Sequence, residues 1–146
     1  SDGDRILILG QDKGGKTDGL EQILVRQGDV INGINGVSQN LLKSRLLAPF
    51  REQDEEVEEE LSKNDSSVVI NFSISESSSG DCFSRFLSGG DSGVSIWERL
   101  WHEYTSDDLK YDLLLAPHHC SWRSLHTTAG QITATMLKSQ RMRVQR

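Results

Sequence analysis

The segment 67–74 alternates apolar and polar side chains, the pattern of a half-buried β-strand. Four apolar residues share one face of this expected strand: Val68, Ile70, Phe72 and Ile74. Residues 76–81 are rich in serine and include a glycine, which predicts a turn, and residues 82–87 then return as a second strand. The sequence therefore predicts a β-hairpin in the middle of the chain.

Side chains that bind metals follow two predicted strands at the point where each strand ends. Residues 83–87 run into Ser88-Gly89-Gly90-Asp91, and the apolar strand 111–115 runs into Ala116-Pro117-His118-His119-Cys120. Residues 92–104 between them predict a helix, so both motifs are expected at one edge of a sheet. Carboxylate oxygen and imidazole nitrogen are ordinary zinc ligands. The spacing predicts a metal site made from Asp91, His118 and His119.

Each of these residues also has a simpler interpretation. Asp91 directly precedes the expected helix, where a carboxylate accepts hydrogen bonds from the first backbone N–H groups. His118 and His119 are adjacent, so in an extended segment their side chains diverge and only one of them faces a given metal. Cys120 is a soft ligand, a reactive thiol or a buried packing residue. These alternatives stay open at the level of sequence.

The order of these motifs resembles the C-terminal half of a metallo-β-lactamase-fold metallohydrolase. The likeness spans most of residues 4–124 and includes four further segments: 5–10, 28–32, 47–50 and 64–69. The resemblance implies an α/β fold that is half of an αββα sandwich, a mixed sheet with helices on one face. It also implies that Asp91 and one of His118 and His119 hold Zn²⁺, whose bound water attacks an ester, amide or phosphodiester.

The chain departs from this family in one respect, because the family's His-x-His-x-Asp-His cluster is absent. The four histidines are at positions 102, 118, 119 and 126, so none precedes residue 102. A catalytic zinc usually has three protein ligands and one open position. We therefore expect a truncated metallohydrolase relative that is weakly active or silent, with a substrate that the sequence does not specify.

Half of a sandwich leaves an apolar sheet face or an unpaired strand edge exposed. A symmetric homodimer is the simplest way to cover such a surface, because one two-fold contact substitutes for the missing half. The sequence thus predicts a homodimer, and a non-catalytic homo-oligomeric interaction module is an alternative function.

A second alternative comes from Gly10-Gln11-Asp12-Lys13-Gly14-Gly15-Lys16-Thr17, which matches the P-loop pattern G-x4-G-K-[ST] in full after an apolar strand. Such a loop cradles phosphate with glycine amides, a lysine and a hydroxyl. The residues that follow make a poor P-loop helix, because Gly19 falls in its first turns and Gly28 follows soon after. A lysine- and glycine-rich connecting loop is the competing interpretation.

Charge divides the chain into an acidic body and a basic tail. The net charge is −6, and residues 121–146 contain no acid and five bases, so residues 1–120 carry −11. The five bases are Arg123, Lys138, Arg141, Arg143 and Arg146. We expect a partial metallo-β-lactamase-like domain at 1–124 and a basic tail at 125–146, either solvated, docked on the body or produced by an altered reading frame. The acidic body disfavours nucleic-acid binding.

Composition limits the remaining possibilities. Mean hydropathy is −0.49 and the longest apolar runs are a few residues, so the sequence predicts no membrane span. Cys82 and Cys120 are isolated, which is typical of a reduced cytoplasmic protein, although a bridge between them stays open. Six of the seven residues 54–60 are acidic, which predicts a solvated face of a surface helix at 52–61.

Overall fold

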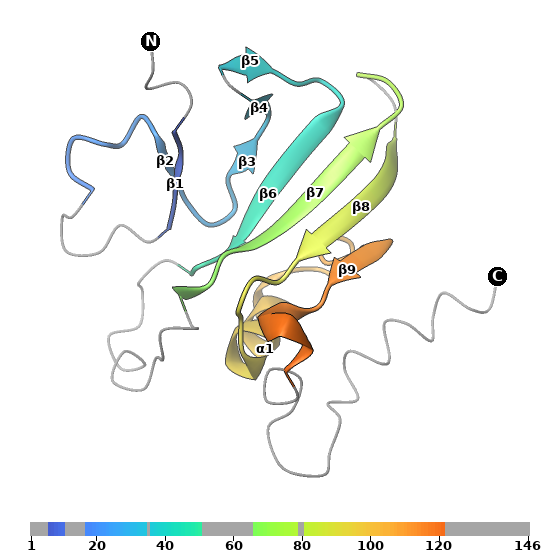
Figure 1. Cartoon of the computed structure of the whole chain (residues 1–146). Helices are drawn as coiled ribbons and strands as arrows, with labels where there is room; N and C mark the ends of the chain where they lie inside the picture. The colour runs from blue at the N-terminus through green and yellow to red at the C-terminus, as the bar shows by residue number, and fades with distance from the viewer. Residues whose placement is uncertain (1–5, 11–16, 35, 51–65, 79–80, 122–146) are drawn as a thin grey trace.

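The fold was obtained as a computed structural model of the 146-residue chain, which describes residues 6–10, 17–34, 36–50, 66–78 and 81–121 (Figure 1). The surface helix expected at 52–61 and the basic tail expected at 125–146 lie outside these residues.

A mixed five-stranded sheet forms the centre of the structure, in the order β3-β6-β7-β8-β9. Its strands are β3 (Val30–Ile31), β6 (Leu42–Ala48), β7 (Val69–Ser75), β8 (Cys82–Ser88) and β9 (Leu113–Leu115). Neighbours are antiparallel except β8 and β9, which are parallel. The predicted α/β class with a mixed sheet is confirmed, and so is the β7–β8 hairpin. Pairing of β6 with β7 begins at Leu42, opposite Ile74.

Besides β3, four short strands precede β6 in the described part of the chain. β1 (Ile8–Leu9) pairs in parallel with β2 (Leu24–Val25), and β4 (Gly33–Ile34) forms a hairpin with β5 (Val37–Ser38). The second of the two Asn-Gly pairs falls at this hairpin, and Gly36 has a positive φ of 73°, as such turns require. Val25 of β2 packs with Leu46 and Ile70 of the central sheet.

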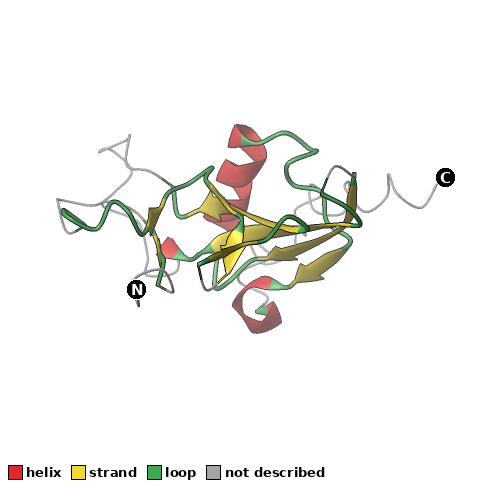
Figure 2. Cartoon of the chain, turned by 90° about the horizontal axis from the view of Figure 1, so that it is seen from above, coloured by secondary structure: helices red, strands yellow, loops and turns green. Residues whose placement is uncertain are grey.

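The helix α1 (Val94–Glu103) covers one face of the central sheet (Figures 1 and 2). Ile96 and Leu100 are buried against Leu47, Val69 and Leu87, which point to this face from β6, β7 and β8. Burial of these side chains, at roughly 1.5–3 kcal/mol for each large one, holds the helix on the sheet.

The two tryptophans of α1 lie in different surroundings. Trp97 is partly buried and packs against the core, whereas Trp101 is exposed. The sheet-facing stripe centres on Ile96 and Leu100, and Trp101 falls beyond its border. Within the described residues, no helix is long and apolar enough to cross a membrane.

Candidate functional site

The β8–α1–β9 unit brings the two predicted metal motifs together. The parallel register pairs Ser88 with Leu115, so the residues after each strand leave the sheet at the same end. Gly89, Gly90 and Asp91 follow β8, and Ala116 starts the segment after β9. The juxtaposition that the sequence predicted is therefore present in the fold.

Asp91 and His119 are the two predicted ligands that the structure places in contact. Their side-chain atoms Oδ1 and Nε2 lie 3.8 Å apart, and both side chains are exposed to solvent. Two donors bound to one zinc ion at about 2.0–2.1 Å in tetrahedral geometry lie about 3.3–3.4 Å apart. A small side-chain movement would therefore let both atoms bind one ion.

A left-handed turn, Pro117–Cys120, carries the two histidines, so the extended segment expected from the sequence is wrong. His118, His119 and Cys120 have φ values of 48°, 52° and 62°. Left-handed backbone costs a non-glycine residue roughly 1–2 kcal/mol, and such conformations gather at functional sites. The turn is closed by the Ser121 amide, which donates to the His118 carbonyl over 2.8 Å.

The turn is also tied to the glycine pair after β8. The backbone N–H of His118 donates to the Gly90 carbonyl over 2.9 Å, which fixes the histidines next to Asp91. The His118 and His119 rings are 6.3 Å apart and inclined at 74°, so they point in different directions. His119 is the histidine whose ring reaches Asp91.

Both glycines before Asp91 are required by close packing. A Cβ on Gly90 would lie 2.7 Å from the Val68 carbonyl oxygen, and its φ of 52° is left-handed. A Cβ on Gly89 would lie 2.7 Å from the Trp97 ring and 3.1 Å from Pro117. Trp97 thus packs against the backbone of the Asp91 motif, next to Pro117 of the histidine turn. This role was not predicted from the sequence. The signal for it was the glycine pair itself, which lets a backbone approach a large ring closely.

The capping interpretation of Asp91 is wrong, because α1 begins after Gly93 and no side chain caps its first turn. Instead, the buried Ser92 hydroxyl donates to the Gly89 carbonyl over 2.6 Å and closes the bend between β8 and the helix. That bend leaves the Asp91 carboxylate exposed beside His119.

The two cysteines are free and exposed, so a Cys82–Cys120 bridge and a buried Cys120 are both excluded in this structure. Cys120 ends the left-handed turn. In the part of the chain that the structure describes, no group of three or more His, Cys, Asp and Glu side chains is arranged to hold a metal ion. The pair Asp91 and His119 fits half of a catalytic zinc shell, not a complete one.

Titratable groups with shifted pKa values lie away from this pair, around the turn that leads into β9. The hydrogen bond from the Thr105 hydroxyl lowers the pKa of Asp108, and the Arg45 guanidinium lowers it further while pairing with the same carboxylate. The buried Asn71 donates to the carbonyls of Asp108 and Lys110 over 2.9 and 3.1 Å. These bonds fasten the turn to the sheet and so help to position β9.

The P-loop match begins at Gly10 and ends at Thr17, and the residues between them lie outside the described part of the chain. After Thr17 the chain forms turns and then enters β2, whose first residue is Leu24. A phosphate-binding P-loop needs a helix that starts at this point, because its N-terminal amides hold the phosphate. The local structure therefore disfavours a nucleotide site.

Comparison of the chain with family models, curated proteins and solved structures found no match.

Proposed function

We propose that this chain is a partial metallo-β-lactamase-like metallohydrolase domain that binds Zn²⁺ weakly through Asp91 and His119 and is a poor hydrolase by itself. The observation that supports the proposal is the 3.8 Å contact between Asp91 Oδ1 and His119 Nε2 at the ends of two neighbouring parallel strands. An exposed carboxylate and an exposed imidazole at this separation suit one divalent ion.

The strained turn gives further support. Three successive non-glycine residues are in left-handed backbone, a conformation that costs stability and gathers at functional sites, and backbone hydrogen bonds of His118 hold the turn. A role for His119 at the site accounts for a conformation that directs its ring to Asp91.

The proposal of weak activity follows from the number of donors. A zinc that carries a reactive water is held by three protein groups, and the described residues bring two together. When bound, zinc supplies a hydroxide at neutral pH and polarises the bond to be cleaved. With two donors, affinity is low and the ion is poorly fixed against a substrate.

Zinc titration of the purified chain, followed by calorimetry or by competition with a fluorescent chelator, tests the proposal. Asp91→Asn and His119→Gln are each expected to weaken zinc binding at least tenfold, and chelation should reverse the binding. His102→Gln is the matched control, because His102 is exposed on α1 and is not part of the site. Equal loss in all three variants would contradict the assignment.

Two further variants sharpen the ligand set. If zinc binding is lost in His118→Gln and kept in His119→Gln, the histidine ligand is His118 and not His119. Loss in Cys120→Ser would identify the thiol as a third donor. An esterase and phosphodiesterase panel measures activity, and rapid turnover abolished by Asp91→Ala would contradict the proposal of a poor hydrolase.

A further inference from the structure

The face of the central sheet opposite α1 presents a row of large apolar side chains. Alternation along the strands and the register between them place six such residues on this open face: Leu42, Phe72, Ile74, Phe86, Leu113 and Leu115. Leu113 is 63% exposed, Leu115 55% and Ile74 48%. Phe72 and Phe86 stack at the centre, with ring centroids 5.7 Å apart. Among the described residues no helix covers this face.

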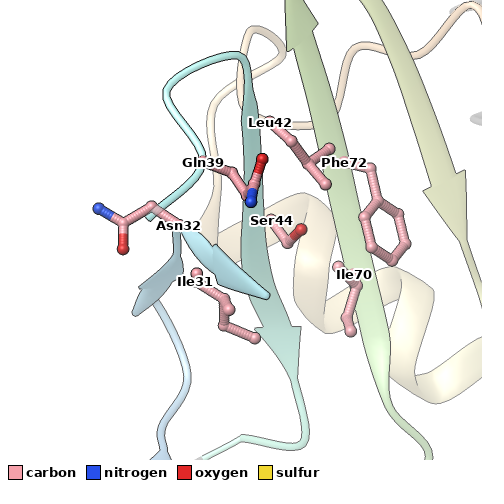
Figure 3. A pocket seen from close by; sticks show the side chains of 8 residues that line it. Ile31, Asn32, Gln39, Leu42, Ser44, Ile70 and Phe72 are labelled. Carbon is pink, nitrogen blue, oxygen red and sulfur yellow. The ribbon is translucent and has the colours of Figure 1, made fainter. Parts of the chain in front are cut away.

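The open face extends into an apolar hollow of about 180 Å³ beside β3 (Figure 3). Ile31, Leu42, Ile70 and Phe72 are its apolar lining residues. The lower part of the same face, at Leu46 and Ile70, is covered by Val25 of β2. The uncovered part therefore runs from this hollow across β7 and β8 to the edge strand β9.

Charge is distributed unequally between the two faces of the sheet. The charged residues of the central strands β6 to β9 are Lys43, Arg45 and Arg85, and alternation places all three on the α1 side. Ser44, Ser84 and Ser88 are the polar residues that these strands add to the open face. An occupant of the open face must therefore be apolar and neutral, because no ionic partner is offered to a charged one.

We propose that the open face is a self-association surface on which a second copy of this chain packs face to face about a two-fold axis. The same apolar, charge-free surface on both partners satisfies the requirement for a neutral occupant, and sheet faces of this kind pack about 10 Å apart. The strands of the open face carry no acidic side chain that could pair with the five bases of the tail. They also present no basic side chain on this face that could bind anionic lipid or nucleic acid. This surface includes neither Asp91 nor His119 and goes beyond the metal proposal.

The size of the face sets the strength of the contact. Strands about 4.8 Å apart and up to seven residues long, at about 3.3 Å per residue, give four strands a face of at most roughly 400 Å², because β9 has three residues and Val25 covers the part at Leu46 and Ile70. Two copies would bury at most roughly 800 Å², below the usual 1,200–2,000 Å² of stable complexes. We therefore expect a reversible dimer that dissociates on dilution.

Sedimentation velocity of the full chain, from about 5 to about 500 µM, tests this proposal. The wild type is expected to shift from monomer to dimer across the range. The double variant Leu113→Lys, Leu115→Lys should remain monomeric, with the dissociation constant raised at least tenfold, because like charges would face each other across the axis. Both side chains are exposed, so the monomer fold should persist, as checked by circular dichroism.

Trp101→Lys is the matched control, because Trp101 is 42% exposed on α1, the helix that covers the opposite face of the sheet. This variant should dimerise like the wild type. A monomeric wild type over the whole range would overturn the proposal, and so would loss of the dimer in Trp101→Lys alone. Loss on Ile132→Glu with Met136→Glu, but not in the leucine variant, would assign the association to the tail and overturn it as well.

Discussion

Trp97 packs its indole ring against the backbone of Gly89, at the corner where β8 leaves the sheet. A Cβ on Gly89 would come within 2.7 Å of Cζ2 and 3.4 Å of Cη2 of this ring. The same Cβ would meet Pro117 at 3.1 Å, so this corner joins the Asp91 motif, the helix and the histidine turn in one contact. Any side chain at position 89 has to displace the ring that supports both motifs.

Gly89→Ala is therefore expected to lower the free energy of unfolding by about 1–3 kcal/mol, the usual cost of overpacking a tight site. Urea denaturation followed by tryptophan fluorescence measures it. Gly10→Ala is the control, because a Cβ there meets nothing within 4 Å. If both variants unfold at the same urea concentration as the wild type, the contact is not as tight as described.

Leu100→Ala should lower the free energy of unfolding by about 2–5 kcal/mol. Leu100 is fully buried between α1 and the sheet, so its truncation leaves a cavity. Trp101→Ala, one residue further along the helix, removes a larger but exposed side chain and should cost far less. Thermal and urea unfolding of the two variants compare these positions directly. A larger loss for Trp101 would contradict the orientation of α1.

Cys120→Gly should raise the free energy of unfolding by about 0.5–1 kcal/mol, because glycine adopts the φ of 62° without strain. The gain is partly offset by the greater freedom of glycine in the unfolded chain. Thermal unfolding under reducing conditions gives the measurement, with Cys82→Gly as the control in a strand, where glycine is unfavourable. Destabilisation by both changes to the same extent would argue against a left-handed turn.

Stability should depend on the ionisation of Asp108. The Thr105 hydroxyl and Arg45 hold its pKa below the usual value in the folded state, so the carboxylate stabilises the fold above its unfolded pKa. That contribution is lost as the pH falls through the lower folded pKa. Asp108→Ala should lower the free energy of unfolding by about 1 kcal/mol at pH 7. The difference in this free energy between the variant and the wild type should become smaller below about pH 4.

Urea unfolding of both proteins at a series of pH values would measure this difference. A difference that stays constant down to pH 2.5 would show that Asp108 acts through packing alone. Ser106→Ala, in the same exposed turn, is expected to show no such pH dependence.

The P-loop match is expected to bind nothing specifically, because turns and a strand follow Thr17 where a phosphate-binding helix is needed. ATP or GTP with Mg²⁺ should leave the melting temperature of the chain unchanged, and Lys16→Ala should behave like the wild type. A nucleotide-induced rise in melting temperature that disappears in Lys16→Ala would reverse this conclusion.

Much of the fold followed from periodicity. The alternation at 67–74 predicted β7 and the shared face of Ile70, Phe72 and Ile74, and the pattern at 92–104 predicted α1. The alternation did not predict which face α1 covers, because the helix packs on the side of Val69 and leaves Ile74 48% exposed. Together with the apolar run at 113–115, these elements predicted that Asp91 and the pair His118 and His119 would lie at one end of the sheet, and the structure places His119 beside Asp91. Local pattern was sufficient here because the three elements are consecutive.

The left-handed turn could not be predicted in the same way. His118, His119 and Cys120 carry Cβ atoms that disfavour positive φ, so local preference argues for extended backbone. The hydrogen bond from the His118 amide to the Gly90 carbonyl, across a gap in sequence, overrides that preference. The start of β6 depends on a non-local contact in the same way, because Leu42 is in a strand through its pairing with Ile74. The relationship to metallo-β-lactamase-fold enzymes and the role of zinc stay predictions.

The unit β8–α1–β9 and the turn after it place both proposed donors in one uninterrupted stretch of chain, from Cys82 to Cys120. A gene rearrangement with breakpoints outside this stretch transfers the Asp91–His119 pair whole, together with the glycines and the tryptophan that position it. The proposed half-site is therefore contained in one continuous segment, a cassette in the sequence. A neighbouring sequence that supplied one more imidazole could restore a complete site without any change inside the cassette.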